Sequence, residues 1–267
     1  PENIPFNHTI YQDLTEYRCV GYENYRYISL IIDQGTRYLS AKVLRSKAGA
    51  IQHLIEWTRR YEDKHGKPLR LQTDNGGEFV NASYQAFCNN NGIAHSCGAP
   101  YTPQTQGLVE RANRTIKNLL KKMFLDHPNC PEHLWPAFIP GIVRTTNSLF
   151  HKSIKKSPYF AKNKKIAKES VNLGDRVKFI DPKQTLIKSS TYKSQFGIFG
   201  GRISSSECIV VATRNNGSRN GGWIALRLHP KYVKSANSRL DVTLEDIVQP
   251  EEQEPEVVFD DPTIITE

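Results

Sequence analysis

Two acidic residues in this sequence have neighbours and a spacing that suit metal-assisted chemistry. Asp74 follows an apolar run typical of a strand, in LQTDNGGEF (71–79), and Glu110 lies in a run with helical periodicity; 35 residues lie between them. Carboxylates on rigid elements hold hard divalent cations such as Mg²⁺. Two such cations about 3.5–4 Å apart activate an attacking oxygen and stabilise a leaving oxygen at a phosphodiester. The pair therefore predicts metal-dependent phosphoryl transfer.

The flanking residues distinguish this interpretation from ordinary structural roles. Asp-Asn-Gly at 74–76 is, by itself, a common turn signature, and Glu110 by itself is an ordinary solvated helix residue. Together, however, TDNGGEF and PYTPQTQGLVERANRTIK (100–117) resemble the second-aspartate motif and the glutamate helix of the DDE integrases of retroviruses and LTR retrotransposons. With TTNSLFHKSIKKSPY, the resemblance covers at least residues 8–160.

The resemblance implies a metal site and a reaction. Asp13, Asp74 and Glu110 would hold two Mg²⁺ ions, with Mn²⁺ as a substitute, for 3′ end processing and strand transfer of element DNA into target DNA. Asp13, in YQDLTEY, matches the family's first aspartate, and 60 residues lie between it and Asp74. Asp33 is the alternative. Because it follows a strand antiparallel to the first, it should lie at the opposite end of the sheet, so we favour Asp13.

The resemblance also implies contacts with DNA near the predicted metal site. One helical face should carry basic and amide side chains beside Glu110, and the preceding loop should place further side chains near the DNA ends. These candidates are Asn113, Arg114, Lys117 and Lys121 on the helix, and Tyr101 and Gln106 at the loop. A solvated basic face is the alternative interpretation.

The elements that must position these residues follow from the sequence pattern. Strands are predicted at 8–15, 25–32, 37–44, 69–73 and 93–97. Helices are predicted at 47–63 with Ser46 as its cap, at 81–91, at 107–126 and at 131–150, where Pro136 and Pro140 must kink or split the helix. A β-meander followed by βαβ units predicts an α/β fold: a mixed five-stranded sheet with flanking helices, as in the ribonuclease H-like fold.

Beyond this predicted core domain (1–150), the sequence changes character. Residues 151–172 are interpreted as a basic linker, with seven lysines in 151–168. Short strands and glycine-rich turns within 173–240 predict a small β-barrel, and LGDRVKFID and YKSQFGIFGG resemble the SH3-like C-terminal domain of integrases, which implies DNA binding without sequence preference. Its candidate phosphate contacts are Arg176, Lys178, Lys188, Lys193, Arg202 and Lys231.

Charge is distributed unevenly along the chain. The net charge is +9, yet the stretch 241–267 contains ten acidic residues and no Lys or Arg. Residues 1–240 therefore hold all 36 basic residues against 17 acidic ones, a net charge of +19. A body this basic indicates a polyanionic partner, with DNA first, although solvated lysine faces give the same composition. The acidic stretch is predicted to be a largely disordered tail.

Cysteine usage and hydropathy bound the remaining possibilities. The five cysteines are scattered without a C-x-x-C pair, which favours a reducing compartment and predicts no zinc site; His95 and Cys97 are interpreted as core residues. No apolar run suits a transmembrane helix or a signal peptide, so no membrane partner is expected. The chain begins without Met and is interpreted as an excised fragment or a processed product, with the family's zinc-binding domain upstream.

The resemblance further implies a homo-oligomer, a tetramer or larger, acting on DNA in the host nucleus after synthesis in the cytoplasm. The acidic tail leaves open a host chromatin-targeting partner. Two alternatives remain: an insertion-sequence transposase of the same fold, and a domesticated integrase-like domain that binds DNA or chromatin without catalysis.

Overall fold

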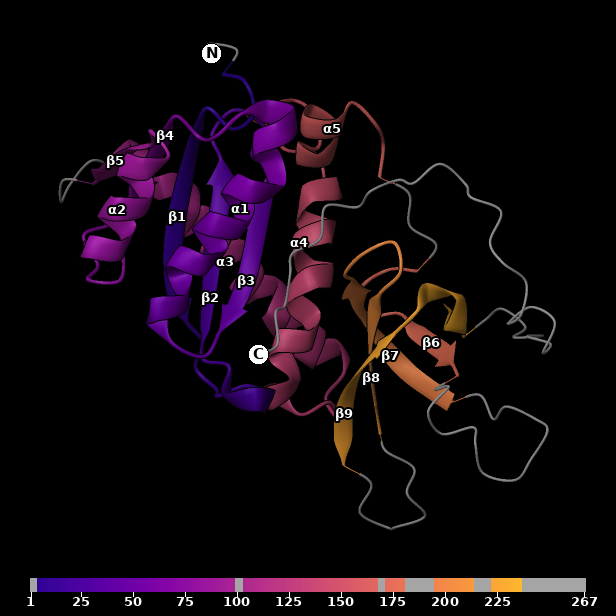
Figure 1. Ribbon diagram of the computed structural model, residues 1–267. Coiled ribbons are helices and arrows are strands. Elements are labelled where there is room, and N and C mark those ends of the chain that lie inside the picture. The colour runs from indigo at the N-terminus through magenta and orange to yellow at the C-terminus, as the bar shows by residue number, and fades with distance from the viewer. Residues whose placement is uncertain (1–3, 99–102, 168–170, 181–194, 214–221, 237–267) are drawn as a thin grey trace.

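The computed structural model describes residues 4–98, 103–167, 171–180, 195–213 and 222–236, and it contains two five-stranded sheets (Figure 1). The first sheet has the strand order β3-β2-β1-β4-β5. Strands β1, β2 and β3 pair antiparallel, whereas β1–β4 and β4–β5 pair parallel. The predicted α/β, ribonuclease H-like sheet is thereby confirmed. The strands are β1 (Thr9–Glu16), β2 (Tyr27–Asp33), β3 (Leu39–Leu44), β4 (Arg70–Thr73) and β5 (Ala94–Cys97).

Helices cover both faces of this sheet. The α-helices are α1 (Ala50–His65), α2 (Ala82–Asn90), α3 (Pro103–Asp126), α4 (Ile139–Ser148) and α5 (Pro158–Asn163), and the 3₁₀ helices here are η1 (Tyr22–Asn24), η2 (Lys47–Gly49) and η3 (Glu132–Phe138). Side chains of α1 and α2 pack on one face, and those of α3, η3 and α4 pack on the other. Strand β2 is buried on both faces, which explains why apolar residues predominate along it. No helix in the described ranges combines the length and apolar character that spanning a bilayer requires.

Helix boundaries differ from the predictions at two places, and a third prediction is met. The Ser46 side chain makes no capping hydrogen bond, and α1 begins only at Ala50, after η2. Helix α3 begins at Pro103 rather than at 107, since proline's fixed φ suits the first helical turn. The predicted helix at 131–150 is split into η3 and α4, as expected from Pro136 and Pro140.

The second sheet is antiparallel, with the order β10-β6-β7-β8-β9. Its strands are β6 (Arg176–Phe179), β7 (Gln195–Arg202), β8 (Cys208–Thr213), β9 (Trp223–Leu228) and β10 (Val233–Ser235), with η4 (Pro230–Tyr232) before the last. Strands therefore form where the sequence predicts a small β-domain. The predicted tail at 241–267, Lys188 and Lys193 lie outside the described residues.

Glycine allows the second sheet to sit directly on η3 and α4. Backbone meets backbone there: a Cβ on Gly141 would lie 2.4 Å from the carbonyl oxygen of Gly200, and a Cβ on Gly201 would lie 2.3 Å from the amide nitrogen of Gly141. Ile142 of α4 and Ile209 of β8 belong to the same buried cluster. The two sheets therefore share a continuous apolar core.

The segment predicted as a basic linker contains helix α5, which packs on the first domain. Its Lys162 is 7% exposed, and Nζ lies 4.2 Å from the ring centroid of Tyr61, 4.3 Å from that of Tyr38 and 5.3 Å from that of Phe6. Burial among these rings lowers the pKa of Lys162 to about 6, so the packing of its side chain against the rings, more than a full positive charge, anchors α5. Charge composition at 151–172 gives no sign of this burial.

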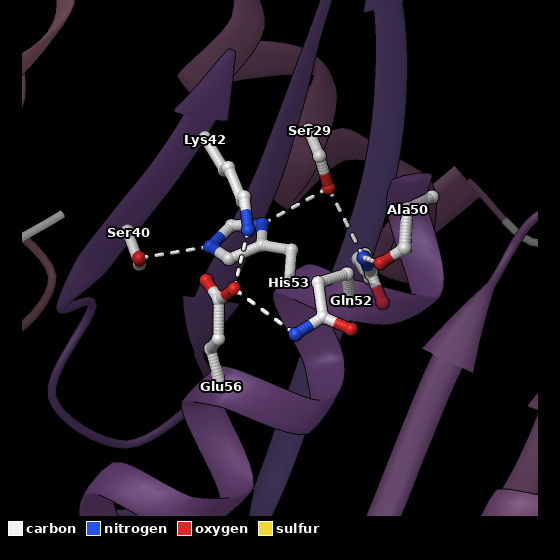
Figure 2. A network of polar contacts seen from close by, with 8 residues as sticks. Ser29, Ser40, Lys42, Ala50, Gln52, His53 and Glu56 are labelled. Carbon is white, nitrogen blue, oxygen red and sulfur yellow. Dashed lines mark hydrogen bonds and ion pairs between the residues drawn. The ribbon is translucent and has the colours of Figure 1, made fainter. Parts of the chain in front are cut away.

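A chain of buried polar side chains ties the sheet to α1 and α2 (Figure 2 shows the part around α1). The Tyr84 hydroxyl donates to Gln12 Oε1 (2.8 Å), and Gln12 Nε2 donates to Ser29 Oγ (3.0 Å). Ser29 Oγ lies 3.0 Å from Nδ1 of His53, whose Nε2 lies 2.9 Å from Ser40 Oγ. Each ring nitrogen of His53 therefore has a serine hydroxyl within hydrogen-bond distance, and Ser29 links the histidine to Gln12.

The sheet-to-sheet contact predicts that Gly141→Ala destabilises the protein. Alanine gains about 1 kcal/mol over glycine inside a helix, but the clash with the Gly200 carbonyl should exceed that gain and leave a net loss of about 1–3 kcal/mol in the free energy of unfolding. Gly222→Ala is the matched control, because a Cβ there has no atom within 4 Å. Denaturant unfolding of both variants provides the measurement, and equal stability of Gly141→Ala and wild type would contradict the described docking.

The buried histidine predicts a pH dependence of stability. Burial, and secondarily the charges of Lys42 and Arg60, lower the pKa of His53 from 6.5 to about 3. Below about pH 6.5, His53 binds a proton in the unfolded chain but stays neutral in the folded chain. The contribution of His53 to the free energy of unfolding is therefore fully present above that pH and is lost as pH decreases toward 3. The free-energy advantage of wild type over His53→Gln should shrink by about 1.4 kcal/mol per pH unit below pH 6. Urea unfolding at pH 7, 6 and 5 measures it; a constant difference would rule out a neutral His53.

Candidate active site

Asp13 and Asp74 are brought together by the parallel pairing of β1 with β4. The register pairs Ile10 with Leu71 and Tyr11 with Gln72, so continuing it by two residues places Asp13 opposite Asp74, immediately after β4 ends. Asp13 is half-buried and Asp74 is exposed. The carboxyl ends of parallel strands meet at one edge of a sheet, which is where such folds commonly bind ligands.

The Asp74 carboxylate is oriented by the turn that follows its strand. Its Oδ1 accepts a hydrogen bond from the Gly76 amide (2.9 Å). A Cβ on Gly76 would lie 3.0 Å from that same oxygen and 2.9 Å from the Glu78 carboxylate, so the turn has little room for a larger residue. Thr73 Oγ1 donates to the Asp74 carbonyl (2.9 Å) and lies 2.9 Å from His95 Nε2. The TDNGGEF motif therefore folds into a turn that fixes one carboxylate.

Several groups act on the Asp13 carboxylate. Burial raises its pKa most, and the nearby charge of Asp74 raises it further. The Leu14 amide donates to Oδ1 (2.8 Å) and the Asn113 amide donates to Oδ2; both hydrogen bonds, together with the charge of Lys117, lower the pKa. A cation bound beside Asp13 and Asp74 would offset the repulsion that Asp74 exerts on the Asp13 carboxylate.

Asp33 has a structural role. It pairs with Ile10, toward the other end of β1, and is fully buried. Its carboxylate accepts hydrogen bonds from the Asn7 amide (2.9 Å) and from the amide and hydroxyl of Thr36 (2.7 and 2.6 Å). These bonds close the turn between β2 and β3. Asp33 is thereby kept away from Asp74 along the direction of β1, as the topology predicts.

Glu110 lies on α3 and is exposed. It is three residues before Asn113, so the two share the helix face that meets Asp13. Within the described ranges no three His, Cys, Asp or Glu side chains gather as a metal-holding group, so Glu110 is not drawn in to the two aspartates. The donor set nonetheless suits a hard cation: two adjacent carboxylates, with the buried Oδ1 of Asn113 lacking a hydrogen-bond donor.

Comparisons with known proteins bear on this arrangement. Residues 6–103 match the family model described as "Integrase core domain". This part of the chain is therefore similar to integrase core domains. The matched stretch includes Asp13 and Asp74, whereas Glu110 follows it in the chain.

The chain is also similar to retroelement polyproteins. It is 38% identical over 125 residues to the Gag-Pro-Pol polyprotein of Human T-cell leukemia virus 2, covering 47% of this chain and 8% of the polyprotein. It is 33% identical over 111 residues to the "Retrovirus-related Pol polyprotein from transposon TNT 1-94" of Nicotiana tabacum, covering 41% of this chain and 8% of that protein. The chain thus spans less than a tenth of these two relatives.

A solved structure of an HTLV-2 integrase catalytic core domain in complex with magnesium, in a trimeric form, aligns with this chain. The TM-score is 0.46 at 29% sequence identity, and the alignment covers 59% of this chain and 97% of that chain.

A groove of about 540 Å³ runs beside α3. The predicted DNA contacts Lys117 and Lys121 line it, together with Glu16, Tyr17, Arg18 and Asn118. The Arg18 guanidinium is held by Glu132 (2.6 Å), which also accepts from the Tyr17 hydroxyl (3.1 Å). The sequence analysis missed Arg18, because only the fold places the end of β1 beside α3.

The other predicted DNA contacts are placed differently. Arg114 is exposed on α3, outside the lining of this groove. Asn113 contacts Asp13, which makes it a positioning residue for that carboxylate. Tyr101 lies outside the described residues, and Gln106 belongs to α3 with a side chain outside the description.

The contacts of Asp13 predict opposite effects of two substitutions on its pKa. Asn113→Leu removes a donor that stabilises the carboxylate, so the pKa of Asp13 should rise; Asp74→Asn removes a like charge, so the pKa should fall. Carbon-13 NMR titration of labelled aspartate carboxyl groups measures both in metal-free protein. Asn118→Leu, which alters the groove without touching Asp13, is the control. Shifts of the same sign in the first two variants would contradict the described geometry.

Proposed function

We propose that this chain is a DDE integrase that processes the 3′ ends of a retroelement's DNA and joins them to target DNA in a Mg²⁺-dependent reaction. The observation that carries the proposal is the register of β1 and β4, which sets Asp13 and Asp74 side by side within the stretch that is similar to integrase core domains. The supporting observation is the groove along α3 that Lys117 and Lys121 line, since the charge of Lys117 also acts on the Asp13 carboxylate.

The residues have distinct tasks in this reaction. Asp13, Asp74 and Glu110 would hold Mg²⁺, or Mn²⁺ in its place, which supplies charge stabilisation at the phosphodiester when bound. Glu110 would complete the set through movement of α3 or its side chain toward the aspartates. Asn113 holds the Asp13 carboxylate in place, and the Lys117 and Lys121 ammonium groups in the groove would neutralise DNA phosphates.

The proposed chemistry has two transfers at phosphorus. In the first, a water oxygen attacks a phosphodiester near the 3′ end of the element DNA. The bond between phosphorus and the 3′ oxygen of the retained strand breaks, the terminal nucleotides leave with a 5′ phosphate, and a 3′ hydroxyl remains on the element. In the second, that 3′ oxygen attacks a target phosphodiester, and a target 3′ oxygen leaves. Neither step forms a bond to the protein, so the chain contributes orientation and electrostatics.

The setting of the reaction belongs to the same proposal. Two DNA molecules must meet at one site, so we propose a homo-oligomer, a tetramer or larger, with element ends and target DNA as partners. We also propose that it acts in the host nucleus after synthesis in the cytoplasm, with a host chromatin factor as a further partner.

A strand-transfer assay tests the enzymatic proposal. With a labelled element end and Mg²⁺, wild type should produce joined products, while Asp74→Asn and Glu110→Gln should reduce them to background because each removes a ligand charge. Asp63→Asn, at an exposed position of α1, is the matched control and should retain activity. If Asp74→Asn and wild type perform alike, or if wild type binds DNA without joining it, the chain is a DNA-binding protein instead of an enzyme.

A further inference from the structure

The second sheet carries an exposed aromatic ring between two cations. Phe196 on β7 is 48% exposed, although most large apolar side chains of this sheet are buried. The guanidinium carbon of Arg176 lies 4.5 Å from its ring centroid, and Nζ of Lys178, directly across the β6–β7 pair, lies 5.8 Å away. Neither cation forms an ion pair with a described carboxylate. We call Arg176, Lys178 and Phe196 the β6–β7 strip.

The strip borders a groove on the second sheet. The groove has a volume of about 440 Å³ and lies between the strands of the second sheet and the loop that follows α3. Apolar surface comes from Phe196, Trp223 and Pro128, and polar groups come from Arg176, His127 and Asp126. Because Gly141, Gly200 and Gly201 dock this sheet on α4, both walls of the groove are held in place.

The chain itself leaves the described structure at this strip. Strand β10 pairs with β6, with Lys234 opposite Lys178, and the Ala236 amide donates to the Arg176 carbonyl (3.0 Å). Only the four residues 237–240 separate Ala236 from the acidic segment that starts at Asp241. Four extended residues span at most about 14 Å, so the first acidic residues start within reach of the strip.

The composition of this segment complements the strip and the groove. Residues 241–267 carry ten carboxylates and no Lys or Arg, interleaved with apolar residues as in LEDIV and VVFDD. Carboxylates suit the two cations, and apolar side chains suit the exposed ring surfaces. Tethering adds to this: a connection of four residues gives an effective concentration of about 1 mM, so an intrinsic dissociation constant of only about 0.1 mM would keep the strip roughly ten times more occupied than free.

We propose that the acidic segment 241–267 binds the β6–β7 strip of its own chain and so competes with nucleic acid for this face. Carboxylates and DNA phosphates seek the same cations, so release of the segment would be needed before the strip takes DNA. The inference concerns binding alone, so it stands or fails independently of whether the protein joins DNA strands.

Photo-crosslinking in the full chain tests the contact. With p-benzoylphenylalanine in place of Phe196, illumination should join position 196 to peptides from 241–267, and high salt should reduce the yield. The same group at Phe150, which is 69% exposed at the end of α4, should give no such products. Mixing isotopically heavy and light protein separates two cases: heavy–light products would assign the segment to a second copy and overturn the proposal, as would an absence of crosslinks to 241–267.

DNA affinity tests the competition. Replacing the ten acidic residues of 241–267 by Asn and Gln in the full chain should strengthen duplex binding by about 10-fold, following the occupancy above. In an Arg176→Gln/Lys178→Gln background the same replacement should have almost no effect. Arg59→Gln/Lys64→Gln, at exposed positions of α1, is the charge-matched control and should preserve the 10-fold gain. An equal gain in both backgrounds would indicate general charge repulsion and overturn the proposal.

Discussion

The parallel pairing of β1 with β4 is the constraint on which the candidate site depends. It sets Asp13 opposite Asp74 although 60 residues lie between them in the chain, and it does so with backbone hydrogen bonds alone. A shift of the register by one residue would turn Asp13 to the other face of the sheet, away from α3. The cost of the arrangement is two neighbouring carboxylates, which the pKa of Asp13 reflects.

Helix α3 offsets the unfavourable proximity of the two carboxylates and extends the site. Asn113 and Lys117 both stabilise the Asp13 carboxylate, and Lys117 also lines the groove that continues along the helix. The same helix therefore supplies the positioning of a carboxylate and the positive surface for a polyanion. Its face is fixed by packing: Leu108, Ala112 and Ile116 are buried against the sheet, which leaves Glu110, Asn113 and Lys117 at the edge where the aspartates lie.

Much of this arrangement is predictable from sequence. The strand patterns in the sequence locate the strands, and helical periodicity locates the helices. The antiparallel pairing of the first two strands is enough to place Asp13 and Asp33 toward opposite ends of the sheet. Contacts between distant segments are not predictable in this way. Lys162 belongs to a segment predicted to be a linker, and only the fold of α5 shows that it lies among Phe6, Tyr38 and Tyr61. Arg18 likewise lines the groove because of the fold, and its local sequence does not indicate this. Asn113 illustrates the same limit: helical spacing gives its face, while its contact with Asp13 depends on tertiary packing.

The central claim is that Asp13, Asp74 and Glu110 converge on divalent cations. Anomalous diffraction from crystals grown with Mn²⁺ tests it most directly, since the metal positions are then observed without reference to activity. The account predicts an anomalous peak within bonding distance of Asp13 and Asp74, with Glu110 completing the ligands there or at a second peak nearby. A well-ordered site with full occupancy elsewhere, or saturating Mn²⁺ with no peak beside the two aspartates, would contradict it.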